Sequence, residues 1–400
     1  MRIESSTQYL RTGRSTLEKG KSVSDSSDQK CSFIILQPHL EYGGAERQTV
    51  ILANKLVCDG HECHLVLHEA KGGLLVEVDS RVHVHTLGLE NHLATPLVAW
   101  RLARLLKRLP SSLVIVKLWS SILACAMVDR FVPKHVYNYC EDLDPTDHAK
   151  YIRMGLIKQR IIGYIFRNRD HLTANTQTVA HSMVEQYKIS LPAVIPSVVD
   201  IQMVQRKATE GERLREGRPG ALQLVTVGSL IERKGLLYMH RALLESGAHI
   251  DWHIVGEGPL RTTLEDLATG TGPLQLHLYS GTSNPYGYMR SADILLHASL
   301  SEAFGIVIVE SLAVGTPVVA AASIGPTEMR SRLGDRPELL RLFASGDVKE
   351  AKQAVTQAHA NMESPQPSVA IDYMRPYSLE STAKLWVERN LELTRGKNDG

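Results

Sequence analysis

Several features are missing from this chain of 400 residues, and each absence excludes a class of protein. No apolar run reaches the length of about 20 residues that a membrane-spanning helix needs, and the N-terminus lacks the apolar core of a secretory signal. The five cysteines are odd in number and form no CxxC pair, which predicts free thiols in a reducing cytoplasm. The net charge of +2 is too small to indicate nucleic-acid binding.

The length is too great for one core and predicts two domains followed by a tail. Residues 1–30 have almost no large apolar side chains, which indicates either a disordered leader or a mis-annotated start codon. We predict a first domain over 31–205 and a charged, Gly-rich linker over 206–220. The second domain is predicted over 221–375, and a C-terminal helix that crosses back to the first domain, with a tail, over 376–400.

The stretch from Ser299 to Thr316, S-L-S-E-A-F-G-I-V-I-V-E-S-L-A-V-G-T, has the clearest pattern. The apolar run 294–298 before it predicts a buried strand, and a turn of small residues follows. We then predict a buried helix that Gly315 ends, although the β-branched residues 306–309 disfavour helices. A second strand there would leave no crossover between neighbouring parallel strands.

A turn that leads into a helix presents unpaired N–H groups and the positive end of the helix dipole, where phosphates bind. Gly305 allows a ligand to approach the backbone closely. Glu302 and Glu310 flank this turn, and because carboxylates repel phosphate we expect them to bind sugar or ribose hydroxyls. Taken alone, the pair is more simply explained as an exposed turn residue and a helix residue satisfied by a neighbour.

The pair does not stand alone, because residues 301–320 resemble the E-x7-E segment of the retaining glycosyltransferases of family 4, which have the GT-B fold. The resemblance implies that Glu310 holds the ribose of a nucleotide-sugar and that Glu302 lies at the sugar being transferred. The backbone N–H groups suited to the leaving diphosphate are those of Phe304, Gly305 and Ile306.

A second resemblance lies near the start of the first domain, where a strand at 32–36 leads to Gly43-Gly44-Ala-Glu46-Arg and a helix predicted over Gln48–Val57. This βαβ opening lacks the G-x-G-x-x-G spacing of a dinucleotide site. It is similar to the G-G-A-E-R loop of family 4. The resemblance implies that Gly43, Gly44 and Glu46 lie at the cleft, near the donor phosphates and the acceptor.

In the second domain, V-G-S-L-I-E-R-K-G resembles the family's G-R-L-x-x-x-K-G. The resemblance implies that Gly228 and Ser229 lie at the donor and that Lys234 meets its diphosphate, whereas an exposed turn lysine is the plain alternative. Ser229 stands where the family has Arg. Arg233 either replaces that charge, since a guanidinium can grip two phosphate oxygens, or is a surface residue.

Other motifs extend the resemblance with differences. Gly256 and Gly258 fit the family's G-x-G-P turn, which shapes the nucleotide pocket. The family's I-P-N-G-V-D is I-P-S-V-V-D at 195–200, so no ligand role is carried over there. The His that follows a first-domain strand in the family has no clear match after the strand at 113–116, where Lys117 begins the next segment.

Two segments, Leu97–Leu109 and Lys150–Arg169, are basic and amphipathic. They are either the solvated faces of ordinary helices or surfaces that dock on an anionic membrane. Asp142-Leu-Asp144 matches the D-x-D pattern that binds metal in the other glycosyltransferase fold. Three-residue matches are common, so we interpret this one as coincidence and predict no metal and no cofactor.

The resemblance implies an α/β protein with the GT-B fold, in which two Rossmann-like domains with parallel sheets face each other across a cleft. The predicted function is retaining transfer of a sugar from a UDP- or GDP-linked nucleotide-sugar to a glycan or lipid-linked acceptor. We expect it in bacterial polysaccharide or glycoconjugate synthesis, in the cytoplasm or on the cytoplasmic face of the inner membrane. The catalytic candidates are Glu302, Lys234 and Arg233. Two alternatives stay open: an epimerase or phosphorylase on the same fold, and a non-catalytic nucleotide-sugar-binding protein.

Overall fold

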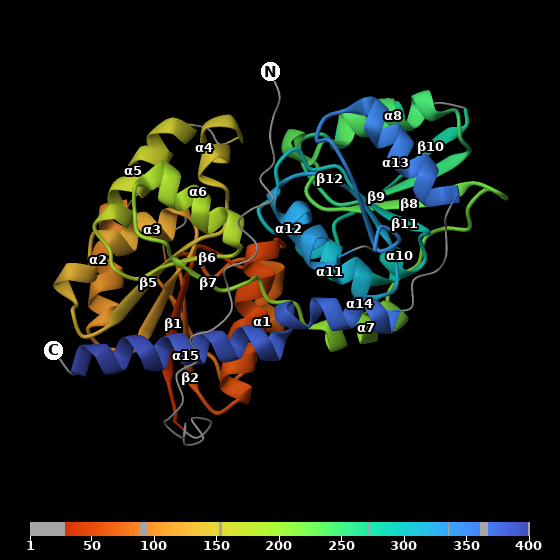
Figure 1. Cartoon of the computed structure of the whole chain (residues 1–400). Coiled ribbons are helices and arrows are strands. Elements are labelled where there is room, and N and C mark those ends of the chain that lie inside the picture. The colour runs from red at the N-terminus through yellow and green to blue at the C-terminus, as the bar shows by residue number, and fades with distance from the viewer. Residues whose placement is uncertain are drawn as a thin grey trace, which may run out of the picture. The chain divides into compact units, whose positions relative to one another are not determined.

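Two parallel β-sheets form the framework of this protein in the computed structural model (Figure 1). The structure describes residues 29–88, 95–151, 154–269, 272–334, 336–360 and 367–398. Residues Cys31–Gly400 form one compact unit, whereas residues 1–28 of the predicted leader lie outside the described residues.

The first sheet has seven strands in the order β3-β2-β1-β4-β5-β6-β7, and every pair is parallel. Its strands are β1 (Ser32–Gln37), β2 (Glu62–Leu67), β3 (His83–Thr86), β4 (Leu113–Val116), β5 (Val136–Glu141), β6 (Leu172–Ala174) and β7 (Ala193–Val194). The strand order reverses between β1 and β4. In open parallel sheets, ligands bind beyond the carboxyl ends of the strands at such a switch point.

The second sheet repeats this topology with the order β10-β9-β8-β11-β12-β13, again with parallel pairs only. Its strands are β8 (Leu222–Val227), β9 (Ile250–Val255), β10 (Leu274–Tyr279), β11 (Ile294–His297), β12 (Val318–Ala321) and β13 (Leu340–Phe343). Its switch point lies between β8 and β11. The loops that follow these two strands carry the lysine and the first glutamate singled out in the sequence.

Helices cover both faces of the first sheet. This cover is needed because successive side chains of β1 point to opposite faces of the sheet and are apolar on both. Ile34 and Leu36 pack into one core, whereas Phe33 and Ile35 pack into the other. The helices of this half are α1 (Gly44–Cys58), α2 (Thr95–Leu106), α3 (Trp119–Ala126), α4 (Pro145–Tyr151), α5 (Gly155–Arg167) and α6 (Gln177–Tyr187). Helices α2, α3, α5 and α6 pack on the Ile34 face, and α1 packs on the Phe33 face.

The second sheet is likewise covered on both faces. Its helices are α7 (Ile201–Glu210), α8 (Leu236–Ser246), α9 (Arg261–Leu267), α10 (Tyr286–Arg290), α11 (Ile306–Ala313), α12 (Ile324–Arg332), α13 (Val348–Ala360) and α14 (Pro367–Met374). Short 3₁₀ helices occupy Gly73–Glu77, Asp129–Phe131, Glu232–Lys234 and Arg375–Tyr377. No helix in the described ranges is long and apolar enough to cross a membrane.

The helix predicted after the Glu302 turn is present as α11. Its β-branched residues are tolerated because Ile308 and Val309 are buried between the sheet and its neighbours, and this packing outweighs their weak helix propensity. The linker predicted over 206–220 begins too early, because residues 206–210 are helical. They form the end of α7, because Val204 and Ala208 anchor that helix in the core of the second half.

The chain crosses between the halves twice, and the two crossing segments run side by side. Val199 forms a parallel bridge with Ser378, and its N–H donates to the Tyr377 carbonyl oxygen at 2.9 Å. The second crossing leads into the last helix, α15 (Leu379–Asn398), which lies along the first half in Figure 1. Its Ala383, Trp386 and Leu391 are buried in the Phe33 face of the first core.

Asp200 stabilises the first crossing, because its Oδ1 accepts a hydrogen bond from the Met203 N–H at 2.8 Å and so caps α7. We expect Asp200→Ala to lower the free energy of unfolding by about 1 kcal/mol, as the loss of an N-cap does. Urea denaturation measures this change. Asp200→Asn keeps an acceptor at the same place and should stay close to the wild type; equal losses in both variants would contradict the capping role.

We expect His253, on β9, to make the stability of the second half sensitive to acid. Burial first, and then the neighbouring His277, hold the pKa of His253 at about 4, below its ordinary 6.5, although Asp251 raises it. Its ring nitrogens lie 3.1 Å from the Tyr279 hydroxyl and 2.9 Å from Gln223 Oε1. The folded chain therefore keeps this ring neutral over a pH range where the unfolded chain protonates it.

The stability that a neutral His253 contributes is complete above pH 6.5 and is lost as the pH falls toward 4. Between pH 6.5 and pH 5 we expect a loss of about 1–2 kcal/mol in the free energy of unfolding. Denaturation at a series of pH values should show a smaller loss in His253→Gln. His249→Gln removes an exposed histidine of the same half and should follow the wild type. An unchanged pH slope in His253→Gln would refute the assignment.

Candidate functional site

The loops at the two switch points line a common cavity of about 550 Å³, a size typical of small-molecule sites. The first half contributes the loop from β1 into α1 and the ends of β5 and β6. The second half contributes the loops after β8, β9, β10 and β11, and the start of α11. The topology of each sheet thus explains why segments far apart in sequence meet here.

The start of α11 points an array of backbone donors at this cavity. Phe304, Gly305 and Ile306 all line it, and Gly305 has a φ of 89°, a left-handed conformation that favours glycine. The first N–H groups of a helix have no acceptor within the helix. The loop is held in place from behind, because the Gly325 N–H on α12 donates to the Glu302 carbonyl oxygen at 2.8 Å.

The start of α1 approaches the same place from the first half. A Cβ on Gly44 would lie 3.2 Å from Ile306 Cδ1, so the glycine allows the two helix starts to come close. Helix α1 begins at Gly44 and not at the predicted Gln48, because Gly43 is extended and serves as its N-cap. Both glycines line the cavity.

Glu46, the third acceptor-side candidate, is not among the cavity-lining residues. A Cβ on Gly43 would lie 2.2 Å from Glu46 Oε2, which shows that the carboxylate folds back over its own loop. Burial raises the pKa of Glu46. Its position therefore fits a group that shapes the loop better than one that contacts a ligand in the cavity.

Lys234 and Glu302 form an ion pair at the base of the cavity, with 2.6 Å between Lys234 Nζ and Glu302 Oε2. His297, the last residue of β11, lies 3.5 Å from the same oxygen. Burial would raise the pKa of Glu302, but Lys234 first, and then His297 and Arg233, hold it well below its ordinary range. Burial lowers the pKa of His297. The cluster therefore contains an ionised carboxylate beside a lysine and a neutral imidazole.

Arg233 lines the cavity next to this cluster. Its Nη1 donates to the Ser301 carbonyl oxygen at 2.8 Å, and its own carbonyl oxygen accepts from the Leu300 N–H at 2.9 Å. These bonds fasten the loop after β8 to the loop after β11. With Lys234, Arg233 gives this corner two cations against the one carboxylate of Glu302.

Glu310 lies one turn into α11 and is only 8% exposed. The Tyr286 hydroxyl donates to its Oε1 at 3.0 Å, and Arg47 Nη1 donates to the Tyr286 oxygen at 3.5 Å. Burial raises the pKa of Glu310, and Arg47 and the Tyr286 hydrogen bond only partly offset that effect. Arg47, Tyr286 and Glu310 thus form a chain of contacts from the first half to the second.

The glycine-rich loops of the second half pack backbone against backbone. A Cβ on Gly256 would lie 1.9 Å from the Gly228 carbonyl oxygen, so only glycine fits there. Gly228, Ser229 and Gly256 line the cavity. Gly258 does not; it lies behind the loop, where a Cβ would meet the Leu230 carbonyl oxygen at 2.5 Å.

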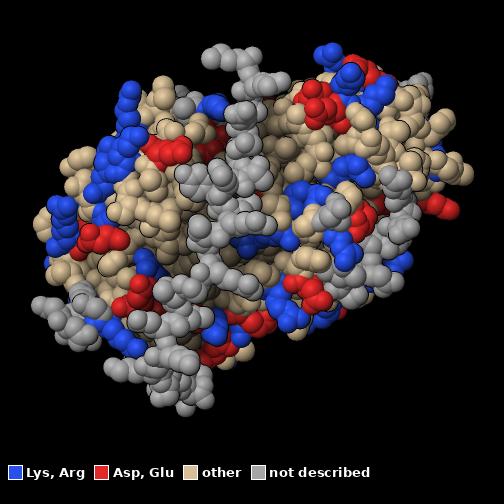
Figure 2. All heavy atoms as spheres, in the orientation of Figure 1, with Lys and Arg blue, Asp and Glu red and all other residues tan. Residues whose placement is uncertain are grey.

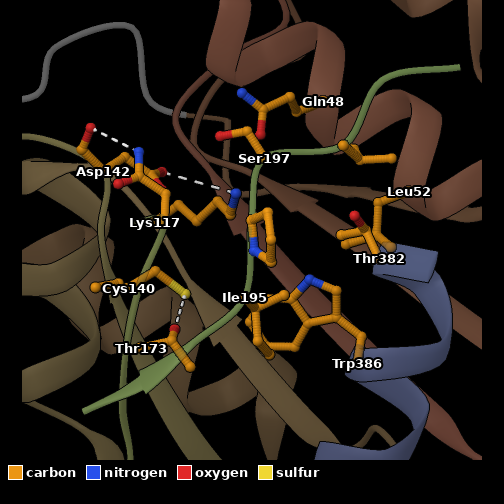
Figure 3. A pocket seen from close by; sticks show the side chains of 14 residues that line it. Gln48, Leu52, Lys117, Cys140, Asp142, Thr173, Ile195, Ser197, Thr382 and Trp386 are labelled. Atoms are coloured by element: carbon orange, nitrogen blue, oxygen red, sulfur yellow. Dashed lines mark hydrogen bonds and ion pairs between the residues drawn. The ribbon is translucent and has the colours of Figure 1, made fainter. Parts of the chain in front are cut away.

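A smaller pocket of about 10 Å³, enough for one water, lies at the carboxyl ends of β5 and β6 (Figure 3). Lys117, which is 7% exposed, lies there with its Nζ 3.7 Å from Asp142 Oδ2. Trp386 and Thr382 of α15 close the other side. Asp142 lines both this pocket and the large cavity, so the two adjoin.

The two aspartates of the D-x-D match have different surroundings. Asp142 faces Lys117 and the cavity. Asp144 instead accepts hydrogen bonds at the start of α4, from the Thr146 N–H at 3.0 Å and from the Ser182 hydroxyl at 2.6 Å. The two carboxylates of the motif therefore make different contacts in the ligand-free structure.

The sequence interpretation missed three residues of the site, namely Arg47, Tyr286 and His297. Arg47 directly follows the G-G-A-E motif, and His297 ends the strand before the E-x7-E segment, so position in the chain was a usable signal for both. Tyr286 had no such signal, because only the packing of α10 beside α11 brings it to Glu310.

Two further contacts join the halves beside the cavity. Glu328 of α12 accepts hydrogen bonds from the N–H groups of Gln177 and Thr178, at 3.3 and 3.1 Å, where α6 begins. A carboxylate is favourable at a helix N-terminus. The Ser301 hydroxyl also donates to Asp147 of α4. The loop that carries Glu302 is therefore tied to the first half.

Family models match both halves of the chain. The model described as Glycosyltransferase Family 4 matches residues 42–203, and that described as Glycosyl transferases group 1 matches residues 213–366. The alpha-monoglucosyldiacylglycerol synthase of Streptococcus pneumoniae is 25% identical over 191 residues, which are 44% of this chain and 43% of that protein. A GDP-mannose-dependent phosphatidylinositol dimannoside mannosyltransferase of Mycobacterium tuberculosis is 39% identical over 88 residues, 22% of this chain and 23% of that protein. The matches thus span less than half of these relatives.

Among solved structures, HepE of Anabaena, in complex with UDP and glucose, superposes with a TM-score of 0.72 at 17% identity. The match covers 90% of this chain and 99% of that one. At this identity the likeness concerns the fold, and it confirms the predicted pair of Rossmann-like domains with parallel sheets.

Proposed function

Because this chain belongs to the glycosyltransferases of family 4 and group 1, we propose that it transfers a sugar from a nucleotide-sugar to a glycan or lipid-linked acceptor and retains the anomeric configuration. One observation carries the proposal. The Lys234–Glu302 pair and the buried Glu310 lie in one cavity, on either side of the backbone donors at the start of α11.

In the proposed complex, the donor diphosphate lies against the first N–H groups of α11, with Lys234 and Arg233 beside it. Glu310 accepts hydrogen bonds from the ribose hydroxyls, and the transferred sugar lies at Glu302. The nucleoside lies against the loops at Gly228, Ser229 and Gly256, where close backbone packing leaves few side chains in the way.

The proposed reaction breaks the bond between the anomeric carbon and the diphosphate oxygen, whose electrons stay with the leaving diphosphate. The acceptor hydroxyl oxygen forms the new bond to that carbon on the same face, and its proton passes to the leaving phosphate oxygen. Lys234, Arg233 and the α11 N–H groups stabilise the negative charge that develops. The ionised Glu302 stabilises the electron-poor sugar ring.

The acceptor is proposed to enter from the first half, past Gly43 and Gly44 and toward Lys117 and Asp142. The lipid acceptors implied by the names of the streptococcal and mycobacterial relatives support a lipid-linked acceptor. The solved HepE complexes contain UDP and UDP-glucose, which supports a UDP-sugar as the first donor to test.

Thermal unfolding with UDP-, GDP- and ADP-sugars tests the donor site. We expect one nucleotide class to raise the melting temperature by several degrees, since a ligand at about 100 times its Kd adds about 2.7 kcal/mol. No rise with any nucleotide would refute the donor site. Conversion of the donor without an acceptor would favour the epimerase or phosphorylase. Binding with no turnover over a wide acceptor panel would favour the non-catalytic binding protein.

A further inference from the structure

One buried nitrogen behind the cavity has no hydrogen-bond partner, although a carboxylate lies close to it. His297 is the last residue of β11 and is only 4% exposed. Its Nε2 lies 3.5 Å from Glu302 Oε2 and forms no hydrogen bond within the described part of the chain. A buried polar group without a partner costs free energy. We therefore expect His297 to gain its partner in another state of the site.

Lys234 occupies the oxygen that His297 faces. Lys234 Nζ lies 2.6 Å from Glu302 Oε2, the same atom that His297 Nε2 approaches. Two cations on one oxygen would repel each other. Burial is the main cause that lowers the pKa of His297; Glu302 raises it, and Lys234 lowers it again. The ammonium group therefore keeps the imidazole neutral as long as it holds Glu302.

The charged groups that act on His297 come from two loops. Lys234 and Arg233 belong to the loop after β8, and Glu302 belongs to the loop after β11. The neighbouring strands β8 and β12 contain no titratable side chain. On α11 the titratable group is Glu310, which accepts a hydrogen bond from α10. Of the two cations, Lys234 contacts the oxygen that faces His297, so a movement of Lys234 would change the surroundings of the imidazole most.

The three side chains of this cluster influence one another more strongly than charges at the surface do. Figure 2 shows Lys, Arg, Asp and Glu side chains over the outside of the molecule, where water and salt screen them. The side chains of Lys234, Glu302 and His297 are instead 19%, 18% and 5% exposed. A new charge beside one of them therefore changes the pairing and the protonation of the others.

A bound donor would bring such a charge. Lys234 and Glu302 line the cavity, whereas His297 is not among the lining residues. A dianionic diphosphate at the start of α11 would attract the Lys234 ammonium, because it carries more negative charge than one carboxylate. We propose that donor binding moves Lys234 from Glu302 to the diphosphate and that His297 replaces it: the imidazole takes up one proton from the solvent and donates a hydrogen bond from Nε2 to Glu302 Oε2. This exchange rests on the proposed function, because it needs the diphosphate in that place.

The exchange would allow Lys234 and Glu302 to act at different parts of the donor. Lys234 would serve the leaving phosphate, while the imidazolium of His297 would keep Glu302 ionised and fixed at the transferred sugar. His297 does not touch the donor, so it is a positioning residue. The site would take up as much as about one proton per donor. The affinity for the donor would therefore fall as the pH rises from the pKa of His297 in the free protein, which lies below its ordinary 6.5, to its higher pKa in the complex.

Calorimetric titration with UDP-glucose, in buffers of different ionisation enthalpy, measures this proton uptake. The diphosphate of UDP-glucose is esterified at both ends, so it does not titrate near neutral pH. At pH 6.5 and above we expect uptake by the wild type and none by His297→Gln. A proton released by Glu310 would have the opposite sign and would be present in both proteins. His253→Gln removes a fully buried histidine outside the cavity-lining set; it is the matched control and should behave like the wild type.

The variant Lys234→Met tests the exchange without any donor. Removal of the ammonium leaves Glu302 buried without its closest cation, so the imidazole of His297 should take its place. We expect the pKa of His297, measured by NMR of the histidine ring, to rise from below 6.5 in the wild type to above 6.5 in the variant. The signal is identified by its absence in His297→Gln. Lys207→Met removes a lysine of similar exposure outside the cavity-lining set and should leave this pKa unchanged.

The outcomes separate this proposal from the proposed function. Absence of binding to both UDP-glucose and GDP-mannose would refute the donor site and, with it, the exchange. Binding without proton uptake, or uptake that persists in His297→Gln, would overturn the exchange alone and leave the donor site intact. A pKa of His297 that stays below 6.5 in Lys234→Met would also overturn the exchange, because Glu302 would then be protonated in place of the imidazole.

Discussion

We expect the change Lys234→Ala to lower kcat/KM for the nucleotide-sugar by about 10²–10³-fold, because it removes a preorganised cation from the leaving diphosphate. The loss should be mainly in kcat, since the charge on that oxygen grows in the transition state. The change also leaves Glu302 buried without its 2.6 Å partner. Steady-state kinetics below the melting temperature of the variant measure the effect.

Lys207→Ala is the matched control, because Lys207 has a similar side-chain exposure, 23% against 19% for Lys234, and also pairs with a glutamate, Glu77, at 3.5 Å. It lies on α7, outside the cavity-lining set. We expect its kcat/KM to stay within about threefold of the wild type, as is usual for a weak ion pair. Equal losses in the two variants would trace the effect to stability and not to the reaction.

Glu310→Gln should move stability and donor affinity in opposite directions. Burial raises the folded-state pKa of Glu310 above its unfolded value. Any stability from this group is therefore present below the unfolded pKa and is lost as the pH rises through the folded pKa. At neutral pH the buried charge is unfavourable without a ligand, so the ligand-free variant should melt at a higher temperature. That gain should vanish below about pH 4.5, where the wild-type side chain is protonated in both states.

The same variant should bind the nucleotide-sugar about 10²-fold more weakly, because hydrogen bonds to a charged acceptor contribute about 1.5–3 kcal/mol each. Calorimetric titration and thermal unfolding with and without donor measure the two effects. Glu245→Gln changes the same charge at an exposed site on α8 and should alter neither quantity. A variant that loses stability in the absence of donor would assign Glu310 a purely structural role.

The sequence was most informative where local pattern and chemistry agreed. The apolar run before Ser299, the glycine at 305 and the carboxylates eight residues apart predicted a strand, a turn and a helix with a ligand site at its start. The structure has the same elements, as β11, the left-handed Gly305 and α11. The resemblance to family 4 likewise implied two parallel sheets, and the solved structures of similar fold confirm it.

The sequence was least informative where tertiary contacts decide. The start of α1 was placed four residues late, because glycine weakens a helix in isolation, whereas here Gly44 admits the neighbouring Ile306. Glu46 belongs to the motif but folds back on its own loop. Tyr286 reaches Glu310 only because α10 packs beside α11. No spacing within a single segment contains this information.

The placement of α15 in the first core has a consequence for synthesis on the ribosome. The Phe33 face of the first sheet includes Trp386 and Leu391, so its core cannot be completed until nearly the whole chain has been made. Translation from residue 205 to residue 391 takes about 10–40 s at about 5–20 residues per second. During that interval the second half can fold, while the first half has α1 but not α15 on the Phe33 face of its sheet and so leaves part of that apolar face uncovered. Nascent chains of this protein should therefore depend on holding chaperones until the last helix emerges.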